Sequence, residues 1–420
     1  MSIFRAYDIR GVYPTELNEE LAYKIGRAFV TFLGCKEVVV GRDMRVSSDK
    51  LFNSLVNGLT DQGANVIDIG LSSTPMLYFA AHDKQAAIMI TASHNSGEYN
   101  GFKLCRKNSI PISGDTGIKD IESLVKENNF EDVSKGSVTK KEVLEDFVAR
   151  NIGGERIEQF YKVVIDSGNG MGGHDLFVAL SRLPIHVLGM NVELDGSFPV
   201  HVPNPMNEEN VSDLKEEVVR VGADIGIAPD GDVDRIGFVD EKGQLVNGDM
   251  ITALIAKSIL KENPGSKIMY DLRSSRSVKE EIEQNGGIPI MCRVGHSFIK
   301  QQMRQEDAAF AGEITGHFYF KDNFFTENST LALIYILNLM SEEGKTLSEL
   351  IEPLKKYHQS GEINSNVDNK EEMMKELEEK YSDGFVSKLD GVSISYVDWW
   401  FNVRPSNTES VLRLNVEANT

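Results

Sequence analysis

Three aspartates at alternate positions give the clearest indication of chemical function in the sequence. They are Asp230, Asp232 and Asp234 in the stretch APDGDVDRIGF, residues 228–238. Side chains two residues apart in an extended loop point to the same side, so the three carboxylates would converge. Carboxylates so close repel one another unless a cation binds them. These hard oxygen ligands suit Mg²⁺ or Ca²⁺ and leave positions for water or a phosphate oxygen.

Two other interpretations of this acidic loop remain open. In an EF-hand calcium loop the twelfth position is acidic, and Glu241 stands there. The sixth position of that motif is a glycine that turns sharply, however, whereas here it is Arg235, and both flanks have the pattern of strands. A solvated acidic turn that binds no ion is the second alternative.

A serine follows an apolar run in MITASHNSGEYNGFKL, residues 89–104. Ser93 and His94 suggest a nucleophile and its base, but we expect adjacent side chains of an extended segment to point to opposite faces, which argues against that pair. An ordinary polar loop is the alternative. The residues that follow instead favour a tight turn that exposes Ser93 at the end of a strand, because their backbones can adopt turn conformations: Asn95, Gly97, Asn100 and Gly101. Lys103 would then be a nearby cation.

Glycines at residues 168, 170 and 173 form a G-x-G-x-x-G pattern between an expected strand and helix. This pattern is typical of dinucleotide-binding folds, so an NAD(P)-dependent oxidoreductase is a competing hypothesis. The acidic residue that should bind the ribose comes late, at Glu193, which favours a tight turn without a ligand. A noncatalytic protein that binds Ca²⁺ or a sugar phosphate is a third hypothesis.

Two further stretches have side chains suited to a phosphorylated sugar. In GEITGHFYF, Glu313 and Thr315 are two residues apart and could together bind vicinal hydroxyls. In RPSNTES a guanidinium, two hydroxyls and an amide lie in one turn, as a phosphate dianion requires; they belong to Arg404, Ser406, Asn407 and Thr408. Each stretch could instead be a capped turn.

The elements that must position these residues follow a repeated order. Residues 37–71, 162–190 and 267–295 each read as a strand, a polar turn, an amphipathic helix and a second strand. We therefore predict an α/β protein with three tandem, similar domains of mixed sheets. After about residue 356 a charged helix and aromatic strands predict a smaller α+β domain. The expected domains are residues 1–149, 150–247, 248–358 and 359–420.

Composition restricts the partners and the compartment. With 44 Lys and Arg against 64 Asp and Glu, the net charge of -20 argues against nucleic acid and anionic membranes as partners. No apolar run is long enough to span a bilayer, and residues 330–340 (TLALIYILNLM) read as a buried helix. Cys35, Cys105 and Cys292 lack metal-ligand spacing and read as reduced thiols. We expect a cytoplasmic protein; the sequence does not indicate its oligomeric state.

A set of motifs in chain order resembles the α-D-phosphohexomutase superfamily, and within it the phosphomannomutase/phosphoglucomutase group. The motifs are FRAYDIRG, GRDMRVSS, TASHNSGEYNGFK, DGDVDR, VGHSFIK, GEITGHFYF and RPSNTE. The resemblance covers nearly the whole chain and implies four domains around a central cleft. It also implies interconversion of hexose 1-phosphate and hexose 6-phosphate, of mannose, glucose or both, through a phosphoserine and a hexose 1,6-bisphosphate, which also serves as activator.

The resemblance assigns a role to each candidate residue. Ser93 would carry the phosphoryl group and bind Mg²⁺ together with Asp230, Asp232 and Asp234, while Arg235 steadies the phosphoserine. Lys103 and His296 would handle protons, and which is acid or base stays open. Contacts with the substrate would come from Tyr7, Arg10, Glu313, Thr315, Arg404, Ser406, Asn407 and Thr408.

Several positions depart from the family pattern. Ser96 and Ser410 replace prolines, and Thr315 replaces a serine but keeps the hydroxyl. Relatives usually continue into a final helix beyond LRLNVEANT, so we expect the fourth domain to lack that helix. Asn407 stands where glucosamine-specific relatives usually have glycine, which favours the mannose/glucose group.

Overall fold

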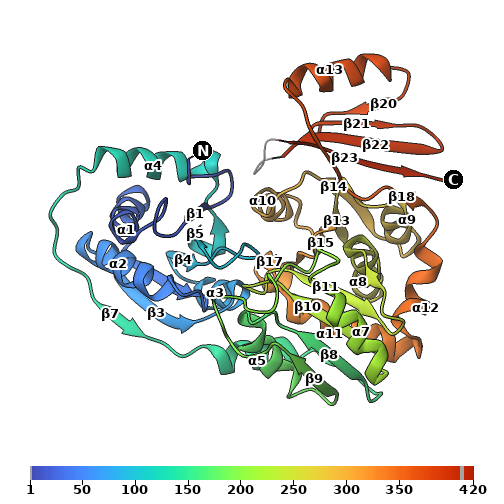
Figure 1. Cartoon of the computed structure of the whole chain (residues 1–420), viewed down its shortest axis with the longest axis horizontal. Coiled ribbons are helices and arrows are strands. Elements are labelled where there is room, and N and C mark those ends of the chain that lie inside the picture. Colours follow the sequence, from blue (N-terminus) through green and yellow to red (C-terminus); the bar gives the residue numbers. More distant parts are fainter. Residues whose placement is uncertain (1, 407–410) are drawn as a thin grey trace.

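The computed structural model describes residues 2–406 and 411–420, and its elements form four sheets with helices packed around them (Figure 1). We call these sheets, with their helices, the first to fourth domains. The first three mix parallel and antiparallel strands, and the fourth is antiparallel. The predicted fold class is therefore confirmed.

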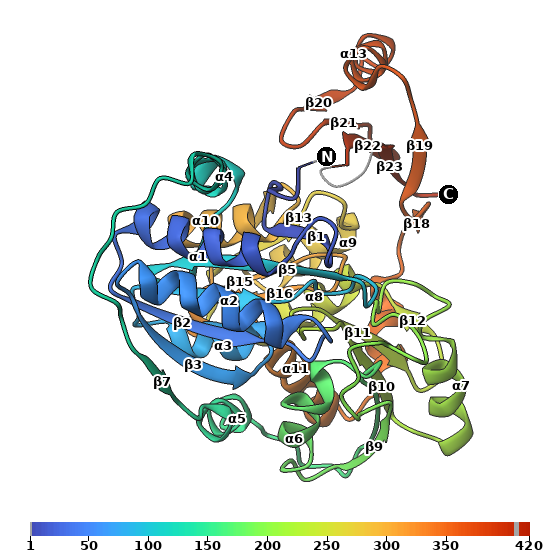
Figure 2. The same cartoon turned by 60° about the vertical axis from the view of Figure 1, so that its left-hand side comes forward.

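The first domain is a helix–sheet–helix sandwich. Alternate residues of its central strand β2 face opposite sides: Val38 and Val40 pack with α1 and α2, whereas Val39 packs with α3 and α5. Figure 2 shows α1 and α2 together over one face. The strands are β1 (Ile9–Val12), β2 (Glu37–Arg42), β3 (Asn65–Leu71), β4 (Ala86–Ile90), β5 (Tyr99–Arg106), β6 (Ile110–Pro111) and β7 (Val138–Lys140), and the helices are α1 (Glu19–Leu33), α2 (Ser48–Asp61), α3 (Thr74–Ala81), α4 (Ile118–Glu127) and α5 (Leu144–Ile152).

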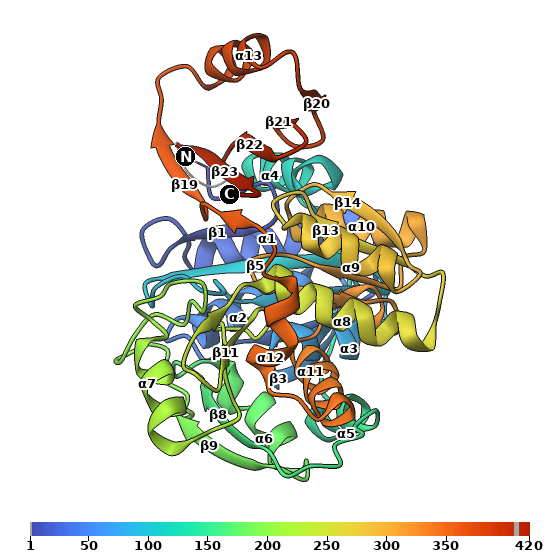
Figure 3. The ribbon, with the colours of Figure 1, turned by 90° about the vertical axis from the view of Figure 1, so that its right-hand side faces the viewer.

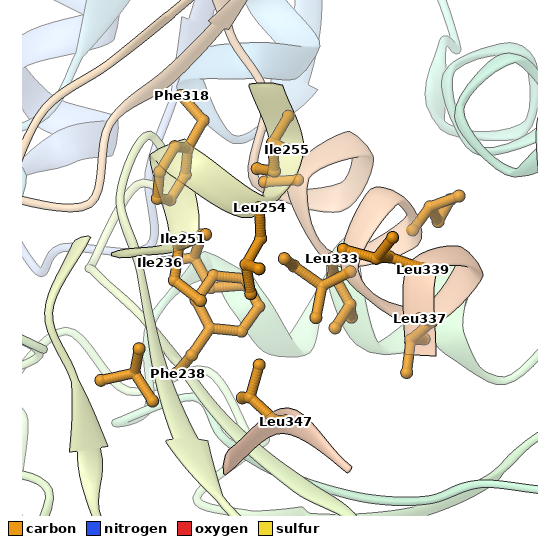
Figure 4. Packing of buried hydrophobic residues seen from close by; sticks show 14 of the residues in the cluster. Ile236, Phe238, Ile251, Leu254, Ile255, Phe318, Leu333, Leu337, Leu339 and Leu347 are labelled. Atoms are coloured by element: carbon orange, nitrogen blue, oxygen red, sulfur yellow. The ribbon is translucent and has the colours of Figure 1, made fainter. Parts of the chain in front are cut away.

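The second and third domains share one hydrophobic core. Figure 4 shows Phe238 of the second sheet beside Leu254 and Leu333 from helices of the third domain. The second domain has β8 (Lys162–Asp166), β9 (His186–Met190), β10 (Ile225–Pro229), β11 (Ile236–Asp240), β12 (Leu245–Val246), α6 (Leu176–Leu180) and α7 (Ser212–Val221). The third has β13 (Lys267–Asp271), β14 (Ile288–Cys292), β15 (Phe310–Gly312), β16 (Phe318–Phe320), β17 (Thr326–Glu327), α8 (Gly248–Glu262), α9 (Arg276–Gln284), α10 (His296–Glu306), α11 (Ser329–Glu343) and α12 (Leu347–Ile351).

Helix α11 contains the apolar run TLALIYILNLM. Its residues are among the most deeply buried of this shared core, as the sequence predicts. No helix of the described residues combines the length and the apolar character that a membrane span would need.

The fourth domain stands at one end of the molecule, above α9 and α10 in Figures 1 and 3. Its described residues form a six-stranded sheet with one helix beside it and a small core of their own. Its elements are β18 (His358–Gln359), β19 (Ile363–Asn366), β20 (Phe385–Ser387), β21 (Val392–Ser395), β22 (Trp399–Pro405), β23 (Val411–Ala418) and α13 (Lys370–Lys380).

An equivalent antiparallel turn occurs in each of the first three sheets. A parallel strand is followed by an antiparallel neighbour in the pairs β4–β5, β10–β11 and β15–β16. The turns between these strands contain Ser93, the three aspartates, and Glu313 with Thr315, respectively. The sequence repeat thus delivers one chemically equipped loop per domain.

Candidate active site

The candidate residues from all four domains meet at one cavity of about 500 Å³. Its lining includes Tyr7, Arg10, Ser93, Lys103, Asp234, Arg235, His296, Glu313, Thr315, Arg404 and Ser406. Asp230 and Asp232 are fully buried next to it. Asn407 and Thr408 lie outside the described residues.

The Ser93 turn is held by a buried arginine that the residue-by-residue reasoning missed. Arg45 pairs with Asp43 and donates hydrogen bonds to the carbonyl oxygens of Ser93 (2.8 Å), Asn95 (2.5 Å), Ser96 (2.6 Å) and Tyr99 (3.0 Å). Its motif, GRDMRVSS, contributed to the family resemblance but gave no spacing signal of its own. Because one guanidinium binds four carbonyls, the turn has a fixed shape.

Ser93 adopts a left-handed backbone conformation with φ of 53°. The expectation that His94 points away from it was wrong, because that expectation assumed extended backbone: Ser93 Oγ lies 3.2 Å from His94 Nδ1. Burial, and then Arg235 and Arg10, lower the pKa of His94 well below its usual range. No carboxylate of the described residues hydrogen-bonds His94, so the orienting member of a triad is missing.

The three aspartates converge as the alternation predicts. One carboxylate oxygen from each lies within 4.8 Å of the others, and all three side chains are buried. Ser93 Oγ donates a hydrogen bond of 2.6 Å to Asp230 Oδ2. Burial, with repulsion from Asp232 and Asp234, raises the pKa of Asp230 well above its usual range.

Lys103 partly neutralises this acidic cluster. Its ammonium donates to Asp232 Oδ2 at 2.6 Å and to Asp234. Burial raises the pKa of Asp234, but Lys103 and then His317 outweigh it and hold that pKa well below its usual range. The second oxygens of Asp232 and Asp234 have no hydrogen bond within the described residues. The buried Asp232 oxygen without a hydrogen bond, beside two further carboxylates, fits a divalent cation.

His317 joins the aspartate loop to the turn that contains Glu313 and Thr315. It was missed as a single residue, although it lies inside the GEITGHFYF motif. Its Nε2 lies 3.2 Å from Arg235 Nε and 3.4 Å from Asp234, while Nδ1 is 2.8 Å from Glu313. Burial and Arg235 lower its pKa, but Asp234 and Glu313 raise it more, to about 9. Tyr319 also donates to Glu313, at 2.6 Å. Glu313 therefore has a fixed orientation in the cavity.

A cationic cluster of three arginines lies where the third and fourth domains meet. Three guanidinium groups surround the carboxylate of Glu362: Arg413 at 3.1 Å, Arg404 at 3.2 Å and Arg273 at 3.6 Å. Of these arginines the sequence reasoning identified Arg404 alone. Arg413 could have been found, because it pairs with Arg404 across the β22–β23 ladder. Arg273 is buried against Asp271 and had no motif signal.

The N-terminal motif contributes Tyr7 and Arg10 to the lining of the cavity. Arg10 donates to Asn95 Oδ1 at 2.5 Å and pairs with Asp8. The Tyr7 hydroxyl is 3.4 Å from the carbonyl of Val294, and its ring contacts that of His296 edge-on at 5.6 Å. Burial, with Asp390 nearby, raises the pKa of Tyr7 to about 12.

The competing site hypotheses find no support in this geometry. In the glycine turn, backbone N–H groups are bound within the protein: Gly168 to Asp166, and Met171 to the carbonyl of Gly231 at 3.0 Å. The turn thus packs on the aspartate loop instead of forming a pyrophosphate cradle. Glu241 accepts from Thr346 at 2.9 Å and from Ser348, and so does not complete an EF-hand.

Comparison with known proteins agrees with this site. Four family models match in order: "Phosphoglucomutase/phosphomannomutase, alpha/beta/alpha" domain I at residues 1–132, domain II at 144–243 and domain III at 247–357, and the C-terminal domain at 362–420. The phosphomannomutase of Escherichia coli K12 is 39% identical, covering 100% of this chain and 95% of its own. That of Methanocaldococcus jannaschii is 41% identical, covering 100% and 94%. A crystal structure of a family protein from Burkholderia thailandensis has a TM-score of 0.93 at 33% identity, covering 100% and 93%.

With four domains around one phosphate-suited cavity and matches along the whole chain, the protein belongs to the phosphoglucomutase/phosphomannomutase family. It is accordingly a phosphohexomutase, an enzyme that acts on hexose phosphates.

Proposed function

We propose that the protein interconverts the 1- and 6-phosphates of mannose, glucose or both, with Ser93 as the residue that carries the phosphoryl group. The observation that carries this proposal is the 2.6 Å contact between Ser93 Oγ and Asp230 within the buried aspartate cluster. A serine in this place can bear a phosphoryl group while a cation and fixed donors stabilise its charge.

Mg²⁺ is the cation proposed for this site, bound by Asp230, Asp232, Asp234 and the phosphate on Ser93. It would offset negative charge on the transferring group. Arg235, which borders the cavity beside the aspartates, would hold the phosphate on Ser93. Lys103 and His296 are proposed to exchange protons with Ser93 and with the sugar hydroxyl.

The cationic cluster of Arg273, Arg404 and Arg413 is proposed to bind the phosphate that is not being transferred. Arg404 and Ser406 line the cavity there, and Asn407 and Thr408 follow them in the sequence. Tyr7, Arg10, Glu313 and Thr315 line the same cavity and would contact the sugar. With one donor serine and one such cluster, the hexose 1,6-bisphosphate must reverse its orientation before its other phosphate returns to Ser93. A trace of hexose 1,6-bisphosphate would act as activator by restoring phosphoserine.

Each proposed domain then supplies one loop. Residues 1–149 provide the phosphoserine, 150–247 the metal loop, 248–358 the sugar-recognition loop and 359–420 the phosphate-binding loop. We place the enzyme in the cytoplasm, where its phosphorylated substrates and reduced cysteines belong.

A coupled assay tests this function. The enzyme is supplied with Mg²⁺ and a trace of glucose 1,6-bisphosphate, and mannose 1-phosphate and glucose 1-phosphate are offered separately while the 6-phosphates are followed. We expect turnover of at least one substrate, and loss of nearly all turnover in Ser93→Ala. Ser96→Ala, in the same turn, is the control and should stay active. Full activity of Ser93→Ala would refute the proposed mechanism.

A further inference from the structure

Two buried polar atoms beside the cavity face each other without a hydrogen bond. His296 Nδ1 and Glu327 Oε1 are 3.7 Å apart, and neither atom has a hydrogen-bond partner among the described residues. The Glu327 side chain is fully buried. Because buried polar atoms are almost always hydrogen-bonded, such a facing pair calls for an explanation.

The other oxygen of Glu327 is firmly held. Lys300 Nζ donates to Glu327 Oε2 at 2.9 Å and to the hydroxyl of Tyr78 at 2.9 Å, and it lies over the Tyr78 ring. Lys300 is one turn after His296 on α10, so both side chains share a face of that helix. Tyr78 comes from α3 of the first domain, and Glu327 from β17 of the third. The carboxylate is thus fixed, with one oxygen left for His296.

Stability alone does not account for this arrangement. Apolar side chains could fill the same volume without the desolvation that a buried Lys–Glu pair incurs. The carboxylate instead stands behind a histidine that lines the cavity. Because Nδ1 is shielded from solvent while the ring borders the cavity, Nε2 is the ring nitrogen available to a substrate.

We propose that Glu327 is a positioning residue that accepts a hydrogen bond from His296 Nδ1–H and thereby fixes the tautomer whose lone pair is on Nε2. A shift of about 0.7 Å would bring the two atoms to the usual separation of roughly 3.0 Å. Lys300 and Tyr78 hold the carboxylate in register. This inference rests on the proposed function, in which His296 exchanges a proton with the substrate.

The fixed tautomer suits phosphoryl transfer from Ser93. As the sugar oxygen bonds to phosphorus, its proton passes to His296 Nε2, the Ser93 Oγ–P bond breaks, and that bond's electron pair stays on Oγ. The proton on Nδ1 remains there, and the Glu327 charge stabilises the imidazolium. Burial, then Lys300 and Lys103, lower the pKa of His296 well below its usual range, which keeps the ring neutral beforehand.

The tautomer can be read directly by nitrogen-15 NMR of histidine side chains, with the His296 signals identified by their loss in His296→Gln. The wild-type enzyme should show Nδ1 protonated and Nε2 unprotonated. A dominant Nε2–H tautomer would overturn the proposal. This measurement requires no turnover, so it stands apart from any failure of the proposed function.

Glu327→Gln inverts the hydrogen bond without changing the shape of the side chain. The Lys300 ammonium can only donate, so it takes the amide oxygen and turns the NH₂ group toward His296 Nδ1. We expect the Nε2–H tautomer and a kcat roughly 10- to 100-fold lower, with KM nearly unchanged. Arg304→Met is the matched control: Arg304 lies on the same helix and binds the carbonyl of Asn108 across the same interface and that of Phe324 within the third domain. It should keep the wild-type tautomer and kcat.

A double-mutant cycle separates positioning from general damage. In the His296→Gln background, Glu327→Gln should cause no further loss of kcat, because its effect passes through His296. Multiplicative losses in the double variant would overturn the proposal. If Glu327→Gln does not fold, the wild-type tautomer alone decides.

Discussion

At the scale of single residues, the end of the cavity that contains Ser93 is defined by three buried carboxylates that are unequally neutralised. Lys103 binds Asp232 and Asp234, and the His317 imidazole lies 3.4 Å from Asp234. Asp230 is left with donors that carry no charge, among them Ser93, and its pKa is raised by burial and by the other two aspartates. A divalent cation would relieve this imbalance, so activity should depend on all three carboxylates.

Asp232→Asn tests that dependence. The substitution removes one of three negative charges while keeping the shape of the side chain. We therefore expect weaker Mg²⁺ binding and a kcat that is lower by at least about 100-fold. Activity is measured while Mg²⁺ is titrated. Glu241→Gln is the control, since Glu241 binds Thr346 and Ser348 away from the cluster. An unchanged Mg²⁺ requirement in Asp232→Asn would contradict the assignment.

A second residue-scale prediction concerns pH. The hydrogen bond to Asp166 raises the pKa of His201 in the folded state, against burial, which lowers it. A raised folded-state pKa means that the stabilisation is complete below the unfolded pKa of about 6.5 and is lost as pH rises through the folded value. His201→Gln should therefore lower stability by about 1 kcal/mol at pH 6 and by less at pH 9. Urea unfolding at both pH values measures this, and an equal loss at both would contradict it.

Residues that share one short loop could be predicted from the sequence, and those brought together by folding could not. The alternation in residues 230–234 alone placed three carboxylates together. Arg45, Arg273 and Glu327 act on the site from other elements. Their positions in the sequence do not indicate that they lie near it. Ser93 shows a third case: its position was predicted, but its left-handed backbone, and hence its contact with His94, was not.

At the scale of elements, the site depends on how closely two turns approach. Gly231 of the aspartate loop has no side chain between it and the Ser93 turn: a Cβ there would lie 2.4 Å from the Ser93 carbonyl oxygen. That oxygen is itself bound by Arg45, so it has little freedom to move. The contact between the first two domains at the site thus requires glycine.

Gly231→Ala should separate the Ser93 turn from the aspartate loop. We expect kcat to fall at least about 100-fold, since displacements near 1 Å are costly in an active site, with a smaller loss of stability. The control is Gly154→Ala, where the new Cβ meets nothing within 4 Å and the backbone is not left-handed. Both variants are compared by kcat and by thermal unfolding. Retention of wild-type kcat in Gly231→Ala would show that the turns have room to adjust.

At the scale of the whole molecule, the domains are joined unequally. The second and third share a continuous core, whereas the fourth has a core of its own and meets the third largely through polar contacts. The repeat in the sequence predicted three similar domains and a smaller fourth. It could not reveal the shared core, because side chains that pack across domains look the same in sequence as those that pack within one.

One polar attachment of the fourth domain is made by Arg276, the first residue of α9. Its guanidinium donates to the carbonyls of Tyr396 (2.6 Å), Val397 (2.7 Å) and Trp399 (3.2 Å), and its backbone N–H donates to the buried Glu417 (3.1 Å). This attachment sets how the β22–β23 strand pair, which carries Arg404, faces the cavity, although Arg276 itself does not line the cavity.

Arg276→Met should therefore alter substrate binding from a distance. Without three charge-assisted hydrogen bonds, the fourth domain would populate orientations that face away from the cavity. Substrate binding would then have to shift this equilibrium back, which weakens the apparent affinity. We expect KM for the hexose phosphate to rise roughly tenfold, which corresponds to about 1.4 kcal/mol, with faster amide hydrogen exchange in β21–β23. Lys279→Met is the control, because Lys279 lies on the same helix and forms a surface ion pair with Glu283 of that helix. If hydrogen exchange accelerates while KM stays unchanged, the attachment serves stability alone, because the freed domain would then dock as readily as the anchored one.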